Sequence, residues 1–132
     1  MPKAKAPKQK AAKATTVVPG LPAHIFAAAG FPSVAVPAGK HLVVETISVQ
    51  VDVTPPGTKI EAFVNYTCAG TSITLFVPLT YAYTDPGTHF DFHVALQAVR
   101  LYVDPGTSLT LTTYSPGGSA GTLFLSVSGY LV

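Results

Sequence analysis

Apolar and polar residues alternate with a period of two along most of residues 41–131. In HLVVETISVQVDV, one parity holds Val43, Ile47, Val49, Val51 and Val53, and the other holds Thr46, Ser48, Gln50 and Asp52. This alternation is typical of a half-buried β-strand. Similar segments follow along the chain, namely KIEAFVNYTC, ITLFVPLTYAY, HFDFHVAL, QAVRLYVD, SLTLTTY and TLFLSVSGYLV.

Turn-forming residues separate these segments. The tripeptide PGT begins at Pro56, Pro86 and Pro105, and it fits a type II turn because proline fixes φ and glycine supplies a positive φ. Pro78 lies inside ITLFVPLTYAY and predicts an edge strand or a bulge. No amphipathic helix of useful length is evident, so the sequence predicts an all-β fold: an antiparallel, jelly-roll-like β-sandwich of about seven or eight strands.

The chain divides into three regions by composition. Residues 1–16, which we call the arm, contain mostly Lys, Ala, Pro and Gln, have no aromatic residue, and are expected to be disordered on their own. Residues 17–39 are apolar but rich in Pro and Gly, and they predict an extended segment with a short helical turn at His24–Ala29. Residues 40–132 form the predicted sandwich domain.

Charge is concentrated in the arm. The chain has eight basic and six acidic residues, and five of the basic ones are arm lysines, so the rest of the chain has a net charge of −3. Charged residues make up 11% of the sequence, against about 25% in an ordinary soluble protein. Two interpretations stay open: a β domain solvated by its Ser and Thr hydroxyls, or a surface covered largely by other subunits.

Five lysines on a flexible arm predict an electrostatic contact. Such charges bind polyanions without sequence preference and in a salt-sensitive way. No aromatic residue lies among them, so base stacking is not offered. Contact with nucleic acid, docking on a neighbouring subunit and a merely solvated tail all remain possible for the arm lysines, which are Lys3, Lys5, Lys8, Lys10 and Lys13.

The motif HFDFH holds the candidate metal ligands, His89, Asp91 and His93. On a strand the three would project from one face, and neighbours two positions apart suit a pair of ligands for one metal ion. The simpler interpretation is that Phe90, Phe92 and Val94 face the core while the three polar residues face solvent. A pH-sensitive subunit contact through the histidines is a third possibility.

Other enzyme and targeting signals are weak. The single cysteine, Cys68, excludes an intrachain disulfide and is expected to be a small core residue. No nucleophile, phosphate-binding or dinucleotide-binding motif occurs, so no catalytic residue is predicted. The apolar stretch after the arm is interrupted by prolines and does not resemble a signal peptide, and no transmembrane helix is expected.

Two resemblances bear on the fold and the role. VRLYVDPGTSLTLTTY followed by SGYLV resembles the C-terminal half of small uncharacterised bacterial β-sandwich proteins, over about residues 40–132. That resemblance implies a fold but no activity. The plan of a lysine-rich arm before a jelly-roll-like body is similar to that of small icosahedral viral coat proteins, which implies an arm facing the genome and a body forming the shell.

We therefore expect a non-enzymatic structural protein, without a cofactor, that forms a homo-oligomer or decorates a larger assembly such as a virus or phage particle. Its location would be a virion or the cytoplasm, with no membrane partner. One alternative is a sandwich that binds a carbohydrate or a surface polymer through its tyrosines. The other is a metal-dependent, cupin-like enzyme built on His89, Asp91 and His93.

Overall fold

The computed structural model describes residues 16–17 and 25–132, and these residues form ten β-strands and no helix. The strands are β1 (Thr16–Val17), β2 (Ile25–Gly30), β3 (Ser33–Ala35), β4 (Leu42–Thr54), β5 (Glu61–Cys68), β6 (Thr71–Val77), β7 (Thr80–Thr84), β8 (Asp91–Val103), β9 (Ser108–Tyr114) and β10 (Ser119–Leu131). The predicted all-β class is therefore confirmed. The arm lysines lie outside the described residues.

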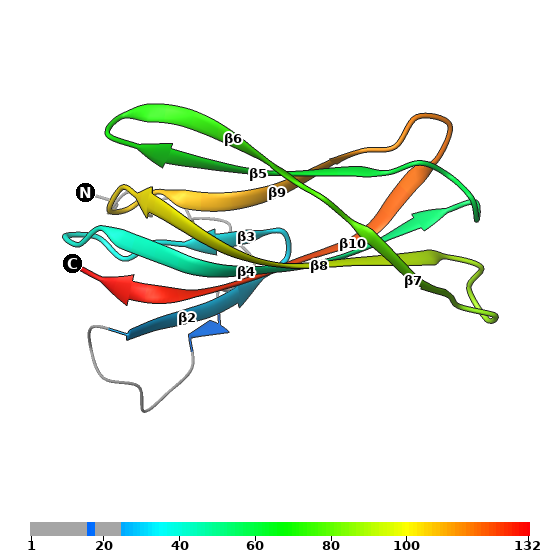
Figure 1. Cartoon of the computed structure of the whole chain (residues 1–132), viewed down its shortest axis with the longest axis horizontal. Coiled ribbons are helices and arrows are strands. Elements are labelled where there is room, and N and C mark those ends of the chain that lie inside the picture. The colour runs from blue at the N-terminus through cyan, green and yellow to red at the C-terminus, as the bar shows by residue number, and fades with distance from the viewer. Residues whose placement is uncertain (1–15, 18–24) are drawn as a thin grey trace, which may run out of the picture.

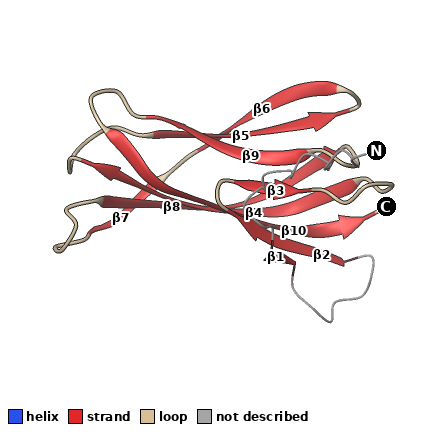
Figure 2. Cartoon of the chain, turned by 180° about the vertical axis from the view of Figure 1, so that it is seen from behind, coloured by secondary structure: helices blue, strands red, loops and turns tan. Residues whose placement is uncertain are grey.

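The strands form two sheets packed face to face (Figure 1). A six-stranded sheet has the order β1-β2-β10-β4-β8-β7, and a four-stranded sheet has the order β3-β9-β5-β6. Every strand pair is antiparallel. The view from behind shows the same two layers, with β5, β6 and β9 on one side and β2, β10, β4 and β8 on the other (Figure 2). The predicted antiparallel sandwich is thus confirmed.

The pairing follows the jelly-roll scheme, in which a long hairpin is folded over on itself. The outermost pair along the chain is β2 with β10, followed by β3 with β9, β4 with β8, and finally β5 with β6. Successive pairs alternate between the two sheets. Strand β7 is an addition at the β8 edge, and β1 is an addition at the β2 edge.

The core lies between the sheets and is built from the alternating positions. Ile47, Val49 and Val51 of β4 are at most 1% exposed, as are Val64 of β5 and Leu111 of β9 on the opposite sheet. Each such side chain contributes roughly 1.5–3 kcal/mol by leaving water. The period-two pattern of β4 therefore predicted the buried face correctly from Ile47 to Val53. It was wrong at Val43, because an irregularity between Val44 and Thr46 places Val44 on the core face instead.

The segment 17–39 contributes two strands that the sequence did not predict. The helical turn expected at His24–Ala29 is wrong over its described part, because Ile25–Gly30 is strand β2 with Phe26 and Ala28 buried. Gly30 ends β2 at a tight corner, where a Cβ atom would collide with the carbonyl oxygen of Ser33. With β1 at the edge of the six-stranded sheet, the described sandwich thus begins at Thr16, ahead of the predicted residue 40.

The segment ITLFVPLTYAY is two edge strands rather than one. Pro78 lies between β6, an edge of the four-stranded sheet, and β7, an edge of the six-stranded sheet. A proline is tolerated at this crossing because its missing N–H leaves no ladder bond unmade. The chain leaves the edge of one sheet and joins the edge of the other along a diagonal that crosses between the two layers (Figure 1).

Two of the three PGT turns match the predicted geometry. Gly57 and Gly106 have positive φ angles of 83° and 70°, and Thr58 and Thr107 donate backbone hydrogen bonds to Pro55 and Asp104. The third turn differs. There, the amide of His89 donates to the carbonyl of Asp85, and His89 rather than Gly87 takes the positive φ, of 59°. One additional residue is therefore enclosed in that turn.

Candidate functional site

Strand β8 is oriented opposite to the sequence prediction. Asp91 is 5% exposed, and it pairs with the buried Val53 of β4 on the inner face. His93 pairs with the buried Val51, so it also points inward. The prediction that Phe92 and Val94 face the core, with Asp91 and His93 facing solvent, is wrong.

Asp91 and His93 share the inward face of β8 with the core residues Leu101 and Val103, and hydrogen bonds satisfy the inward carboxylate. The Asp91 carboxylate accepts a bond of 2.7 Å from the Gly57 amide and one of 2.5 Å from the Thr84 hydroxyl. The Thr84 proton is used on Asp91, so in its 2.7 Å contact with Thr84 the Tyr81 hydroxyl must be the donor. These bonds connect β8, β7 and the turn before β5, and they compensate the inward position of the carboxylate.

The same bonds set the charge of Asp91. The Gly57 amide, followed by the Thr84 hydroxyl, stabilises the charged carboxylate and holds the pKa of Asp91 below its ordinary value, against the opposing effect of burial. Asp91 is therefore ionised at neutral pH.

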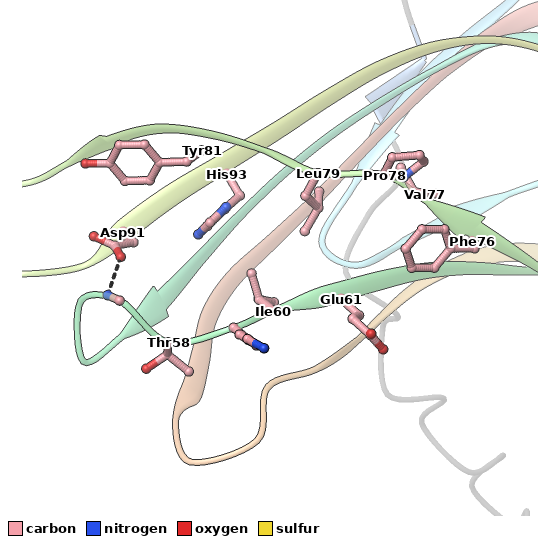
Figure 3. Close-up of a pocket in the computed structure, with 12 residues that line it drawn as sticks. Thr58, Ile60, Glu61, Phe76, Val77, Pro78, Leu79, Tyr81, Asp91 and His93 are labelled. Carbon is pink, nitrogen blue, oxygen red and sulfur yellow. Dashed lines mark hydrogen bonds between the residues drawn. The ribbon is translucent and has the colours of Figure 1, made fainter.

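Asp91 and His93 lie in a cleft at one open end of the sandwich, which we call the end cleft (Figure 3). Its volume is about 630 Å³. The walls come from residues 57–61, from the crossing between β6 and β7, and from the first residues of β8. In Figure 3 the side chains of His93, Leu79 and Ile60 converge from three different segments. The volume of the end cleft exceeds that of two shallower hollows, of about 220 and 260 Å³, beside Phe31.

His93 has an unusual polar environment. Its Nε2 atom is buried and has no hydrogen-bond partner among the described residues. The Tyr81 ring meets the imidazole edge-on, with ring centroids 5.8 Å apart. Buried side-chain nitrogens are nearly always paired in proteins, so this atom is available to a partner that enters the cleft.

The three candidate metal ligands do not come together. His89 is exposed in the turn before β8, while Asp91 and His93 point into the end cleft. Within residues 16–17 and 25–132, no group of three or more His, Cys, Asp or Glu side chains is placed to hold a metal ion. The constellation proposed from HFDFH therefore does not form as a set in the described structure.

Five large apolar side chains lie on the outer face of β7 and β8, and we call them the apolar stripe. They are Tyr83, Phe92, Val94, Leu96 and Tyr102, and the exposed Arg100 shares this face between Leu96 and Tyr102. Leu96 is 75% exposed and Val94 is 40% exposed. Tyr83 and Phe92 stack with ring centroids 4.8 Å apart and planes 4° from parallel. The stripe was not predicted from the sequence, because the HFDFH motif was interpreted with Phe92 and Val94 in the core.

A shallow hollow adjoins the stripe on the same sheet face. It has a volume of about 220 Å³ and is lined by Phe92, Phe124 and Phe31, together with Gln50, Asp52 and Thr122. Asp52 accepts a hydrogen bond from the Thr122 amide, which lies in the bulge of β10. Aromatic side chains of β8 and β10 therefore flank the polar Gln50 and Asp52 of β4 in this hollow.

The outer face of the four-stranded sheet carries paired polar groups beside three aromatic side chains, Phe63, Phe76 and Tyr114. The Ser33 and Thr110 hydroxyls are 2.9 Å apart, and Asn65 donates to Thr112 at 2.9 Å and accepts from Thr74 at 2.8 Å. These cross-strand bonds join β3, β9, β5 and β6. The polar side chains here satisfy one another on the surface.

The remaining candidate residues have structural positions. Cys68 is a partly buried free thiol at the end of β5. Asp104 accepts bonds from the Gly70 and Ala69 amides, both of 2.8 Å, and these bonds lower the pKa of its carboxyl. Tyr81 and Tyr83 are both exposed but lie on opposite faces of β7, so the tyrosines do not form one platform for a sugar.

Comparison with known proteins does not identify a family for this chain. No family model, curated protein or solved structure matches the chain. Among the described residues there is no helix long and apolar enough to cross a membrane.

Proposed function

We propose that this chain is a non-enzymatic assembly protein of the virus or phage capsid or decoration type. Its jelly-roll body would pack through the apolar stripe against other subunits, in a homo-oligomer or a larger assembly. The observation that carries the proposal is the exposure of Leu96, Val94 and Tyr83 side by side on one sheet face. Apolar surface of this kind on a soluble domain marks an interaction site more often than chance.

The charge distribution supports this proposal. Surface charge is what usually keeps domains apart in solution, and the chain beyond the arm has few charged residues. The stripe is also contiguous with the hollow at Phe92 and Phe124, which enlarges the apolar area available to a partner. An interface needs such a central apolar area surrounded by polar groups.

The position of β1 supports separate tasks for the arm and the stripe. Thr16 and Val17 pair with Ala29 and Ala28 at one edge of the six-stranded sheet. The stripe lies at the other edge, over β8 and β7. The lysines that precede β1 would thus be free to contact nucleic acid or a neighbouring subunit while the stripe packs against another body.

Light scattering on the full chain, at low and high salt, tests the proposal. We expect a mass of several subunits that persists at high salt, because apolar contacts are not screened. A chain beginning at Thr16 should keep this mass but lose any nucleic acid that copurifies with the full chain. A monomer under every condition would contradict assembly of this protein with itself.

A further inference from the structure

The end cleft combines a polar floor with an apolar wall. Ile60 and Leu79 lie on one side, and Asp91 and His93 lie on the other (Figure 3). The cleft is open to solvent at the end of the sandwich, and its apolar side chains cover only part of it. A purely aliphatic ligand would leave the polar groups without partners, which makes the cleft a poor match for an acyl chain.

The polar groups have hydrogen-bonding capacity that the protein does not use. The Nε2 atom of His93 has no partner, although it is buried. Each carboxylate oxygen of Asp91 accepts one bond from the protein and has a second lone pair available. A ligand hydroxyl can donate to Asp91 and can either donate to or accept from His93, whichever tautomer is present.

The charges of the cleft select against anions. Two carboxylates, Asp91 and Glu61, line it together with one ammonium group, Lys59. Asp91 is fixed in its ionised form by Gly57 and Thr84. A phosphate or carboxylate ligand would meet net repulsion, whereas a neutral ligand would not.

We propose that the end cleft binds a neutral sugar ring, as a free sugar or as a residue of a polysaccharide. The ring hydroxyls would pair with His93 and Asp91, while the C–H face would pack on Ile60 and Leu79. A pyranose has this combination of an apolar face and hydroxyls that both donate and accept, and a cleft of about 630 Å³ has room for one or two such rings. The inference does not depend on the assembly proposal.

Saturation-transfer NMR on the full chain is the test, because it observes the ligand and works whatever the size of the assembly. The probes are the methyl glycosides of glucose, galactose, mannose and N-acetylglucosamine at millimolar concentration. Glycerol serves as a polyol without a ring, and cyclohexanol as a ring with a single hydroxyl. At least one glycoside should bind more tightly than both small alcohols, with transfer strongest to its C–H face.

Two matched pairs of variants localise the binding. His93→Leu removes the unpaired nitrogen and should weaken binding roughly tenfold, as expected for one lost hydrogen bond. His89→Leu, four positions away in an exposed turn, should bind as the parent does. If His93→Leu fails to fold, Tyr81→Ala tests the mouth of the cleft, and Tyr83→Ala on the opposite face of β7 is its control.

Each outcome of these binding measurements either supports or contradicts the sugar site. Binding that is lost in His93→Leu or Tyr81→Ala and retained in the two controls supports the sugar site. If no glycoside binds to the folded chain, the proposal is wrong. It is equally wrong if cyclohexanol binds as well as the glycosides, or if Tyr83→Ala abolishes binding while Tyr81→Ala does not. None of these results depends on the number of subunits.

Once the ring is identified, a soluble polysaccharide that contains it distinguishes a free-sugar site from a polymer site. Stronger retention on the polymer than on the free glycoside would indicate several ring contacts along an open cleft. Binding of the free glycoside without binding of the polymer would show that the walls at residues 57–61 close around a chain end or a single sugar.

Discussion

The outer faces of the two sheets differ in how their side chains interact with water and with one another. On the four-stranded sheet, hydroxyl and amide side chains bond to one another across the strands, and the aromatic side chains of Phe63, Phe76 and Tyr114 lie beside them. The bonded residues are Ser33, Asn65, Thr74, Thr110 and Thr112. On the six-stranded sheet, the strands at the centre present Ser and Thr, but β8 and β7 present the apolar stripe. The paired polar groups are satisfied in water, whereas the exposed Leu and Val side chains, which only the stripe presents, gain free energy when another surface covers them.

The largest effect should come from placing a charge on the apolar stripe. Leu96→Lys puts an ammonium group at the most exposed large apolar residue of the described chain. A leucine buried in an interface contributes about 1.5–3 kcal/mol, so subunit association should weaken by roughly 10- to 150-fold. Light scattering over a range of protein concentrations measures this change.

Tyr114→Lys is the matched control on the other sheet. Tyr114 is 60% exposed, and it pairs with Glu61 on the outer face of the four-stranded sheet. The same charge there should leave the association constant nearly unchanged. Equal weakening by both variants would mean that net charge, and not the stripe, controls association.

The sequence predicted the strands better than it predicted their partners. The valines of β4 and the leucines of β9 and β10 alternate with hydroxyl residues, so their inner faces could be identified from spacing alone. Strands β2 and β3 were missed because IFAAAG and SVA are short and lie among prolines and glycines. What makes them strands is their pairing with β10 and β9, which are far away in the sequence.

Strand β8 shows why spacing alone was not enough. Both of its parities carry apolar residues: Ala95 and Val99 on one, and Phe92, Val94 and Leu96 on the other. Leu101 and Val103 are buried on the same parity as Asp91, because residues 91–103 form one continuous strand. The apolar stripe was not predicted because HFDFHVAL and QAVRLYVD were interpreted as separate strands. The end cleft could not be predicted because Gly57 and Thr84, which bond Asp91, come from other segments.

A smaller effect should come from the paired polar face. Asn65→Ala removes a donor to Thr112 and an acceptor for Thr74. Because each such bond contributes about 0.5–1.5 kcal/mol and these are exposed, the free energy of unfolding should fall by about 1–2 kcal/mol. Urea unfolding of the Leu96→Lys background measures the change without interference from association.

The stripe itself should contribute little to the stability of a single subunit. Leu96→Lys alone should change the free energy of unfolding by no more than about 0.5 kcal/mol, as for other surface substitutions. A cost larger than that of Asn65→Ala would show that Leu96 stabilises the subunit itself, and the contrast between the two faces would disappear.

The stacked pair in the stripe should stabilise the single subunit, unlike Leu96. Tyr83 and Phe92 cover part of each other within one subunit. Tyr83→Ala should therefore lower the free energy of unfolding by roughly 1 kcal/mol in the Leu96→Lys background, given the usual 0.5–1.5 kcal/mol of an aromatic pair. Tyr102→Ala, also half exposed on β8 but in no ring pair of the described chain, is the control and should cost less.

Acid should affect the ends of the sandwich and leave the difference between its faces intact. The Gly70 and Ala69 amides hold the pKa of Asp104 below its ordinary 3.8, and Gly57 and Thr84 do the same for Asp91. A carboxyl with a lowered folded-state pKa contributes stability that is complete above its unfolded-state pKa and is lost as the pH falls through the folded-state value. Unfolding measured by urea should therefore show a steady loss of stability below about pH 4.

Asp104→Asn should reduce the slope of that loss, because the amide cannot lose its charge on acidification. Asn65→Ala has the same number of ionisable groups as the parent, so it should shift the whole profile downward and keep its slope. A parent profile that stays flat below pH 4 would mean that the amides of Ala69 and Gly70 do not favour the charged carboxylate of Asp104 in solution. A shallower slope in Asp104→Asn alone would locate the acid sensitivity at the turn between β5 and β6, away from both outer faces.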